Sequence, residues 1–347
     1  MESIKRFTAD FGLPRIIIIV FLLALFMAAP VVGVSVPGAV SDILIRVGMN
    51  GIMVLALVPM IQSGCGLNFG LSLGVIAGLL GATMSIEMGL VGAFGFIIAI
   101  VISQGFGAVF GYGYGKLLNR VKGGEMMIST YVGFSSVMLM SIAWLILPYK
   151  DPTMIWGYGG SGLRTTISVE GFWRHILDDL WAIQLGDDFK FPTGALLVFL
   201  AAAGFIWAFF HLKLGTAMTA VGSNPVYARA SGINIDRMRI ISVVMSTMLA
   251  AMGIVVFQQS FGFIQLYEGP LYMAFPAVAA ILIGGAGVNK ATMANVFIGV
   301  LLYQGILTMT PLIFNAVLKV DMSDVIRIIV SNGMILYALT RKTKVLK

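Results

Sequence analysis

The sequence predicts an all-α polytopic membrane protein, a single domain over residues 1–347 that forms a bundle of about ten transmembrane helices. Hydrophobic residues make up 59% of the chain and charged residues only 11%, whereas soluble domains carry roughly 25% charged residues. The mean hydropathy is +0.98. Apolar runs of the roughly 20 residues that a bilayer requires recur along the whole chain. Lipid is therefore the expected solvent of this fold.

Successive apolar segments define the predicted topology. The first follows Lys5 and Arg6 and is longer than the core of a cleaved signal peptide, so we expect it to be a retained helix. The predicted spans are 16–34, 43–62, 69–86, 89–113, 127–147, 192–211, 238–258, 272–288, 291–309 and 323–340.

Basic residues are distributed unevenly between the loops of this topology. With the amino terminus inside, 15 of the 22 basic residues fall on the inner side and five on the outer side, while Arg46 and Arg327 lie within spans. Cytoplasmic loops carry an excess of Lys and Arg. The sequence therefore predicts a multi-pass protein of the cell membrane with both termini in the cytoplasm. Topology also accounts for the net charge of +7 without a nucleic-acid partner.

Glycines recur at helical spacing in two of the spans. Because glycine has no side chain, such rows let helix backbones approach closely in lipid, so they predict tight helix packing. The rows are Gly70, Gly74 and Gly78, and Gly107, Gly111 and Gly115.

Residues 148–191 are predicted to form an extracytoplasmic loop. Apolar and polar positions alternate in it at helical spacing, which indicates an amphipathic helix on the outer interface. Such a helix either acts as a lid or docking surface for an external binding protein, or only covers the mouth of the bundle. Its apolar positions are Phe172, Trp173, Ile176, Leu177, Leu180 and Trp181, and its polar positions are Arg174, His175, Asp178 and Asp179.

The sequence lacks the residue patterns of catalytic and metal sites. His175 and His211 are its only histidines, too few for a metal cluster or a histidine-based triad. Segment 284–291 resembles a phosphate-binding loop, but Asn289 replaces a required glycine and Ala291 replaces the magnesium-binding Ser/Thr. No carboxylate falls at mid-depth, where ion-coupled carriers bind their ion. We expect no enzyme, no metal, no cofactor in this chain, and an energy source outside it.

The predicted cytoplasmic loop 213–237 contains signals for a short helix over Val226–Ser231. Asn224 is a good N-cap and Pro225 suits the first helical position. Gly232 suits the left-handed residue that ends a helix. A helix of under two turns is not stable alone, so it packs either against its own bundle or into a groove on a cytoplasmic partner. Tyr227 and Arg229 favour the partner.

Part of this loop resembles the cytoplasmic loop of permease subunits of bacterial ABC importers, in the ribose/galactose and branched-chain amino acid group. The resemblance lies in Ala220-Val221-Gly222-Ser223-Asn224-Pro225 and in Ala228-Arg229-Ala230-Ser231-Gly232-Ile233-Asn234-Ile235. In that family the loop contacts the ATP-binding subunit. The resemblance thus implies ATPase coupling by Asn224, Pro225, Tyr227, Ala228, Arg229, Gly232 and Ile233.

Two glycine-rich segments extend the resemblance. Segment 64–70 is similar to the family's glycine-rich opening of a core helix, and segment 283–287 is similar to its late glycine-rich region. A helix broken by glycines can expose backbone groups to a solute. Gly66, Asn68 and Phe69 are therefore the candidate pathway residues, with a packing kink as the alternative. The sugar permeases usually have an aspartate where Asn68 stands.

The resemblance implies a transmembrane permease that forms the pathway for a small polar solute. Its expected partners are ATP-binding cassette subunits that hydrolyse ATP, a second permease subunit, an extracytoplasmic solute-binding protein and the lipid bilayer. A monosaccharide is the expected solute, and a nucleoside or a branched-chain amino acid are the alternatives. A secondary carrier driven by an ion gradient is the competing hypothesis from another class.

Overall fold

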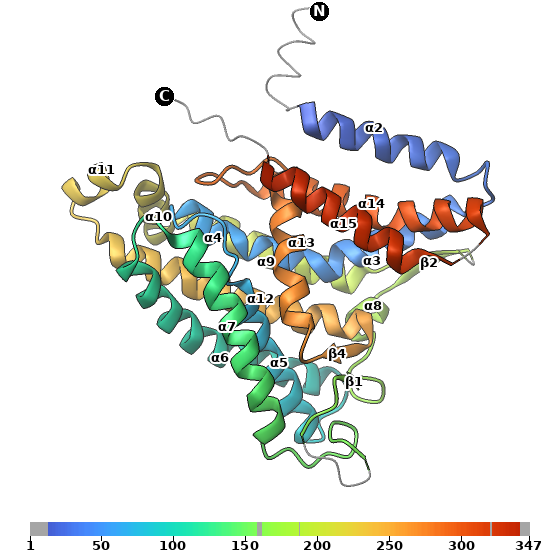
Figure 1. The fold of residues 1–347 in the computed structure, drawn as a ribbon, viewed down its shortest axis with the longest axis horizontal. Coiled ribbons are helices and arrows are strands. Elements are labelled where there is room, and N and C mark those ends of the chain that lie inside the picture. The colour runs from blue at the N-terminus through green and yellow to red at the C-terminus, as the bar shows by residue number, and fades with distance from the viewer. Residues whose placement is uncertain (1–12, 158–161, 187, 320, 341–347) are drawn as a thin grey trace, which may run out of the picture.

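A computed structural model describes residues 13–157, 162–186, 188–319 and 321–340. Each predicted span coincides with a helix (Figure 1). One span is interrupted at Ala56, because Pro59 has no backbone N–H and its ring crowds the carbonyl of Leu55. The helices are α2 (Leu13–Ala28), α3 (Val36–Leu55), α4 (Leu57–Gln62), α5 (Leu71–Glu87), α6 (Gly92–Arg120), α7 (Glu125–Ile146), α9 (Thr193–His211), α12 (Ile235–Phe261), α13 (Gly269–Ile283), α14 (Met293–Leu318) and α15 (Ser323–Thr340).

Six helices in the described part of the chain are long and apolar enough to cross a membrane. They are α3 and α4 taken together as one span (Val36–Gln62), α6, α7, α9, α12 and α14. Helices α2, α5 and α13 are apolar but shorter. The fold is that of a polytopic, mainly helical membrane protein, and the total of about ten spans stays a prediction.

Helix α12 lies at the centre of the bundle and packs against α3, α5 and α6. Five of the six glycines in the two rows face it, and the sixth, Gly70, faces Tyr114 of α6 and Ser129 of α7. A Cβ on Gly74 would lie 2.7 Å from the Thr247 carbonyl oxygen, and one on Gly111 would lie 2.8 Å from the Val244 Cα. The prediction that these rows serve close helix packing is confirmed.

The loop between α7 and α9 differs from the prediction of an amphipathic helix over 172–181, which is wrong. Only α8 (Ile176–Asp179) is helical, because His175 and Trp181 have left-handed backbones with φ of 56° and 53°. Asp178, assigned to the polar face, is buried, and its Oδ1 accepts hydrogen bonds from Ser260 and Gln259. These bonds draw the segment into the end of the bundle.

Four short strands also depart from a purely α-helical fold. β1 (Thr166–Ser168) pairs antiparallel with β4 (Phe263–Gln265), so the loop is fastened to the chain that follows α12. β2 (Ile183–Leu185) pairs with β3 (Phe189–Phe191) as a hairpin.

Loops predicted on the same side of the membrane lie together. At one end, Lys122 pairs with Asp236 at 2.9 Å, and Gln62 donates to the carbonyl of Ala291. At the other end, the Glu87 carboxylate accepts from the backbone N–H of Lys150. Figure 1 shows α10 (Lys213–Ser223) and α11 (Pro225–Ala230) at the first end and β1 and β4 at the opposite end.

Candidate functional site

Helix α11 has the capping geometry that its sequence predicts. It covers Pro225–Ala230, one residue earlier than expected, with proline at its start. The Asn224 side chain accepts a hydrogen bond from the Tyr227 N–H at 3.0 Å. Gly232 follows with φ of +78°, a conformation that glycine adopts without steric cost. The predicted short helix is confirmed.

One side of α11 packs on the bundle and the other is open. Ala228 is completely buried in a small apolar cluster with Val221 and Met238. Val226 is 81% exposed and Tyr227 is 66% exposed. Aromatic residues are common anchors of protein interfaces, and the coupling role of this open side stays a prediction.

Segment 63–70, between α4 and α5, is irregular backbone inside the bundle. Gly64 and Gly66 have φ of +75° and +78°. Asn68 is 1% exposed. Its Nδ2 donates to Ser246 Oγ at 2.9 Å and its Oδ1 accepts from the Tyr114 hydroxyl at 3.1 Å. Asn68 thus joins this segment to α12 and α6.

Polar side chains on one face of α12 hold the irregular segment at three points. Arg239 Nε lies 3.4 Å from Cys65 Sγ, and Ser242 Oγ lies 2.7 Å from Ser63 Oγ. Ser246 completes the row through Asn68. Positions 239, 242 and 246 are spaced by three and four residues, so they share one helix face. Sequence reasoning missed this face, although polar residues at that spacing in an apolar span were a readable signal.

The loop that carries α11 touches the irregular segment directly. A Cβ on Gly222, in the last turn of α10, would lie 2.2 Å from the Gln62 carbonyl oxygen and 2.9 Å from the Gly64 nitrogen. A Cβ on Gly64 would lie 3.0 Å from the Gly222 Cα. Two segments far apart in the sequence therefore meet backbone to backbone.

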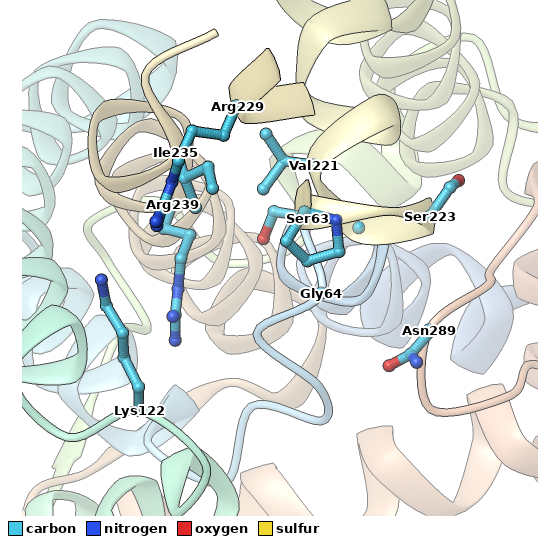
Figure 2. A pocket seen from close by; sticks show the side chains of 11 residues that line it. Ser63, Gly64, Lys122, Val221, Ser223, Arg229, Ile235, Arg239 and Asn289 are labelled. Atoms are coloured by element: carbon cyan, nitrogen blue, oxygen red, sulfur yellow. The ribbon is translucent and has the colours of Figure 1, made fainter. Parts of the chain in front are cut away.

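A pocket of about 370 Å³ opens at this contact. In Figure 2, Lys122, Arg229 and Arg239 lie along one side and Asn289 lies opposite them. Arg239, which is mostly buried, pairs with Glu125 at 2.5 Å. Among the described residues, no group of three or more His, Cys, Asp or Glu side chains is placed to hold a metal ion.

Residues 39–337 match a family described as branched-chain amino acid transport system / permease component. The chain belongs to this family of ABC-importer permeases. The match includes the irregular segment, α11 and all of α12.

The permease is also similar to individual transport proteins. It is 30% identical to the autoinducer 2 import system permease protein LsrC of Enterobacter sp. (strain 638) over 110 residues. The aligned region covers 31% of this chain and 32% of that protein. It is 25% identical over 216 residues to the protein of the same name from Photorhabdus laumondii, which is 58% of each chain. The permease thus spans about a third to somewhat over half the length of these relatives. No solved structure matches it.

The permease brings most of the predicted site residues to one end. Pro225 and Arg229 line the pocket together with Gly64, whereas Ala228 and Ile233 pack in the apolar cluster beneath α11. Gly66 lies against Met126 and Val288, and the Phe69 ring lies 5.7 Å from that of Phe275. The pathway role of Gly66, Asn68 and Phe69 stays a prediction.

Proposed function

We propose that this permease subunit forms the translocation pathway of an ATP-driven importer for a small, uncharged polar solute, in the first place a monosaccharide. The chain does not hydrolyse ATP. Two ATP-binding subunits, a second permease subunit and an extracytoplasmic binding protein complete the importer. The α11 end faces the cytoplasm, and about ten helices cross the bilayer.

The contact of Gly222 with Gly64 is the observation that supports this proposal most directly. It links the loop that resembles a coupling loop to the glycine-rich break between α4 and α5, which packs against α12. An importer needs such a link, because ATP is hydrolysed on cytoplasmic subunits, whereas the access of the solute to the pathway changes inside the membrane.

Two routes carry movement from α11 into the bundle. The ATP-binding subunit seats on Val226 and Tyr227, which are exposed. Movement then passes back through α10 to Gly222 and Gly64, and forward through α12 to the polar side chains at 239, 242 and 246. Packed helices transmit such shifts because their interfaces are dense and switch between discrete arrangements.

The solute class is supported by the resemblance to sugar permeases and by the relatives named for autoinducer 2 import. The family description names branched-chain amino acids, which are the second candidate.

The test is uptake by proteoliposomes that hold the permease, its ATP-binding subunit and its binding protein. Labelled ribose, galactose, autoinducer 2, adenosine and leucine are compared with and without internal ATP. We expect uptake of one uncharged solute, dependent on ATP and insensitive to ionophores. Uptake that runs without the ATP-binding subunit and collapses with an ionophore would replace the importer by an ion-coupled carrier.

A further inference from the structure

Gln258, near the end of α12, has a buried side chain that makes no hydrogen bond. The residue is 1% exposed, and neither its Oε1 nor its Nε2 has a partner. The adjacent Gln259 is also buried, but its side chain bonds to the Leu177 N–H and to Ser260. Unpaired buried amides are rare because they lose their hydration without compensation. The amide of Gln258 therefore keeps its full hydrogen-bonding capacity for a ligand.

Gln258 lines a small cavity between α12, β4 and α13. Three phenylalanine residues line the cavity with Gln258: Phe257 stacks on Phe261 at 5.3 Å, and Phe261 meets Phe263 edge-on at 6.2 Å. Phe261 and Phe263 are each 42% exposed, so the cavity lies just beneath the surface. It is at the end of the bundle opposite α11, beside the β1–β4 ribbon (Figure 1).

The cavity walls identify the class of ligand. Its described lining residues include two amides, Gln258 and Gln265, and none is ionisable. Arg174, which approaches nearby Gly262, pairs with Glu170. An amino acid would leave its ammonium and carboxylate unpaired here. A sugar presents C–H faces that pack on aromatic rings and hydroxyl groups that bond to amides.

We propose that Gln258, with the rings of Phe257, Phe261 and Phe263, is the outer contact site for a neutral polyhydroxylated solute. The inference rests on the proposed importer function. The cavity measures about 10 Å³, enough for about one water molecule. The solute therefore binds in a conformation in which α13 and β4 have moved away from α12.

The first test compares Gln258→Met with Gln104→Met in the reconstituted importer. Met preserves the side-chain length and removes the amide. Gln104 is the matched control, because its Nε2 already donates to the Met248 carbonyl at 3.1 Å. We expect Gln258→Met to raise the Tm of the purified permease, since an unpaired polar group is gone, and to lower uptake of ribose or galactose at least tenfold through a higher KM. Uptake within twofold of wild type would overturn the proposal.

The second test measures the accessibility of position 258, and its labelling step does not require the transported solute to be known. Gln258→Cys in a Cys65→Ser background is treated with a membrane-impermeant thiol reagent, without nucleotide, with ATP, and with ATP and vanadate. We expect labelling from the outer side in at least one state, slowed by ribose or galactose. If no state is labelled, Gln258 does not line a water-filled pathway. If leucine protects and the sugars do not, the solute class is wrong. Absence of wild-type uptake for every probe would refute the proposed solutes, and labelling would still decide the role of Gln258.

Discussion

The absence of side chains at Gly222 and Gly64 allows the backbones of two segments to come into direct contact. In the sequence these residues belong to two separate motifs, yet their backbones are in contact. The approach leaves no room for a methyl group, because the three atoms nearest to a Cβ on Gly222 are backbone atoms of Gln62 and Gly64 that cannot rotate away.

Gly222→Ala tests this contact. The added Cβ pushes α10 away from the Gln62 carbonyl, so we expect the protein to reach the membrane but to lose most ATP-driven uptake. Overpacking of this kind costs about 1–3 kcal/mol. Gly105→Ala is the matched control, since a Cβ there meets nothing within 4 Å. Wild-type uptake for Gly222→Ala would mean that the contact transmits nothing.

Asn68 is a second residue whose role depends on its partners. Asn68→Leu leaves the Tyr114 hydroxyl and Ser246 without their partner, at a cost of about 1–3 kcal/mol. We expect a lower Tm together with lower uptake. Asn68→Asp keeps the acceptor for Tyr114, and Ser246 can turn to donate, so uptake should largely survive. Loss of uptake in Asn68→Leu at unchanged Tm would instead assign Asn68 to the pathway.

At the scale of the element, α11 is a helix too short to stand alone that is nevertheless capped at both ends. Its buried side is the single residue Ala228, while Val226 and Tyr227 point to solvent. Such a division is typical of a short helix that packs on its own protein with one side and binds a partner with the other.

Tyr227→Ala and Gly232→Val test the coupling role of α11. The first removes the exposed ring, and interface anchors of this kind are worth about 2 kcal/mol or more. The second forces a β-branched residue to φ of +78°, at a cost of at least about 1–2 kcal/mol. We expect normal membrane levels, poor copurification of the ATP-binding subunit, and lost uptake. Tyr131→Ala removes a ring of similar exposure from α7, and it should change neither the copurification of the ATP-binding subunit nor the uptake. Normal recovery of the ATP-binding subunit with both α11 variants would reduce the loop to a connector.

Two ion pairs join the α6–α7 turn to the start of α12, and they differ in burial. The Arg239–Glu125 side chains are 9% and 17% exposed, and those of Lys122–Asp236 are 50% and 56% exposed. Glu125→Gln leaves a buried guanidinium without its counter-charge, so we expect about 3 kcal/mol of destabilisation. Asp236→Asn should cost about 1 kcal/mol or less. Thermal unfolding of the detergent-solubilised variants measures both, and equal losses would contradict the burial argument.

At the scale of the whole molecule, contacts between distant loops agree with the alternation of sides that the basic residues predict. At each end of the bundle, loops assigned to the same side are in contact. The charge distribution predicts that the α11 end is the cytoplasmic one.

Single cysteines in a background lacking Cys65 test the topology. Ser223 marks the α11 end. Asp187, a natural choice for the outer loop, lies outside the described residues, and Glu170, whose side chain is 73% exposed, replaces it. We expect an impermeant reagent to label position 170 in intact cells and position 223 only in inverted vesicles. Labelling of both from one side would refute the predicted map.

The sequence by itself determined the membrane class, the positions of the helices and the cap geometry of α11. These depend on local composition and on hydrogen bonds between residues three or four positions apart, which a linear pattern records. The helix that the amphipathic pattern predicts over 172–181 does not form, because Ser260 and Gln259, distant in the sequence, donate hydrogen bonds to Asp178. Only the tertiary structure brought Gly222 to Gly64, Arg239 to Cys65 and Asn68 to Ser246. Such pairings depend on which helix faces meet in the bundle, and no local pattern in the chain specifies that.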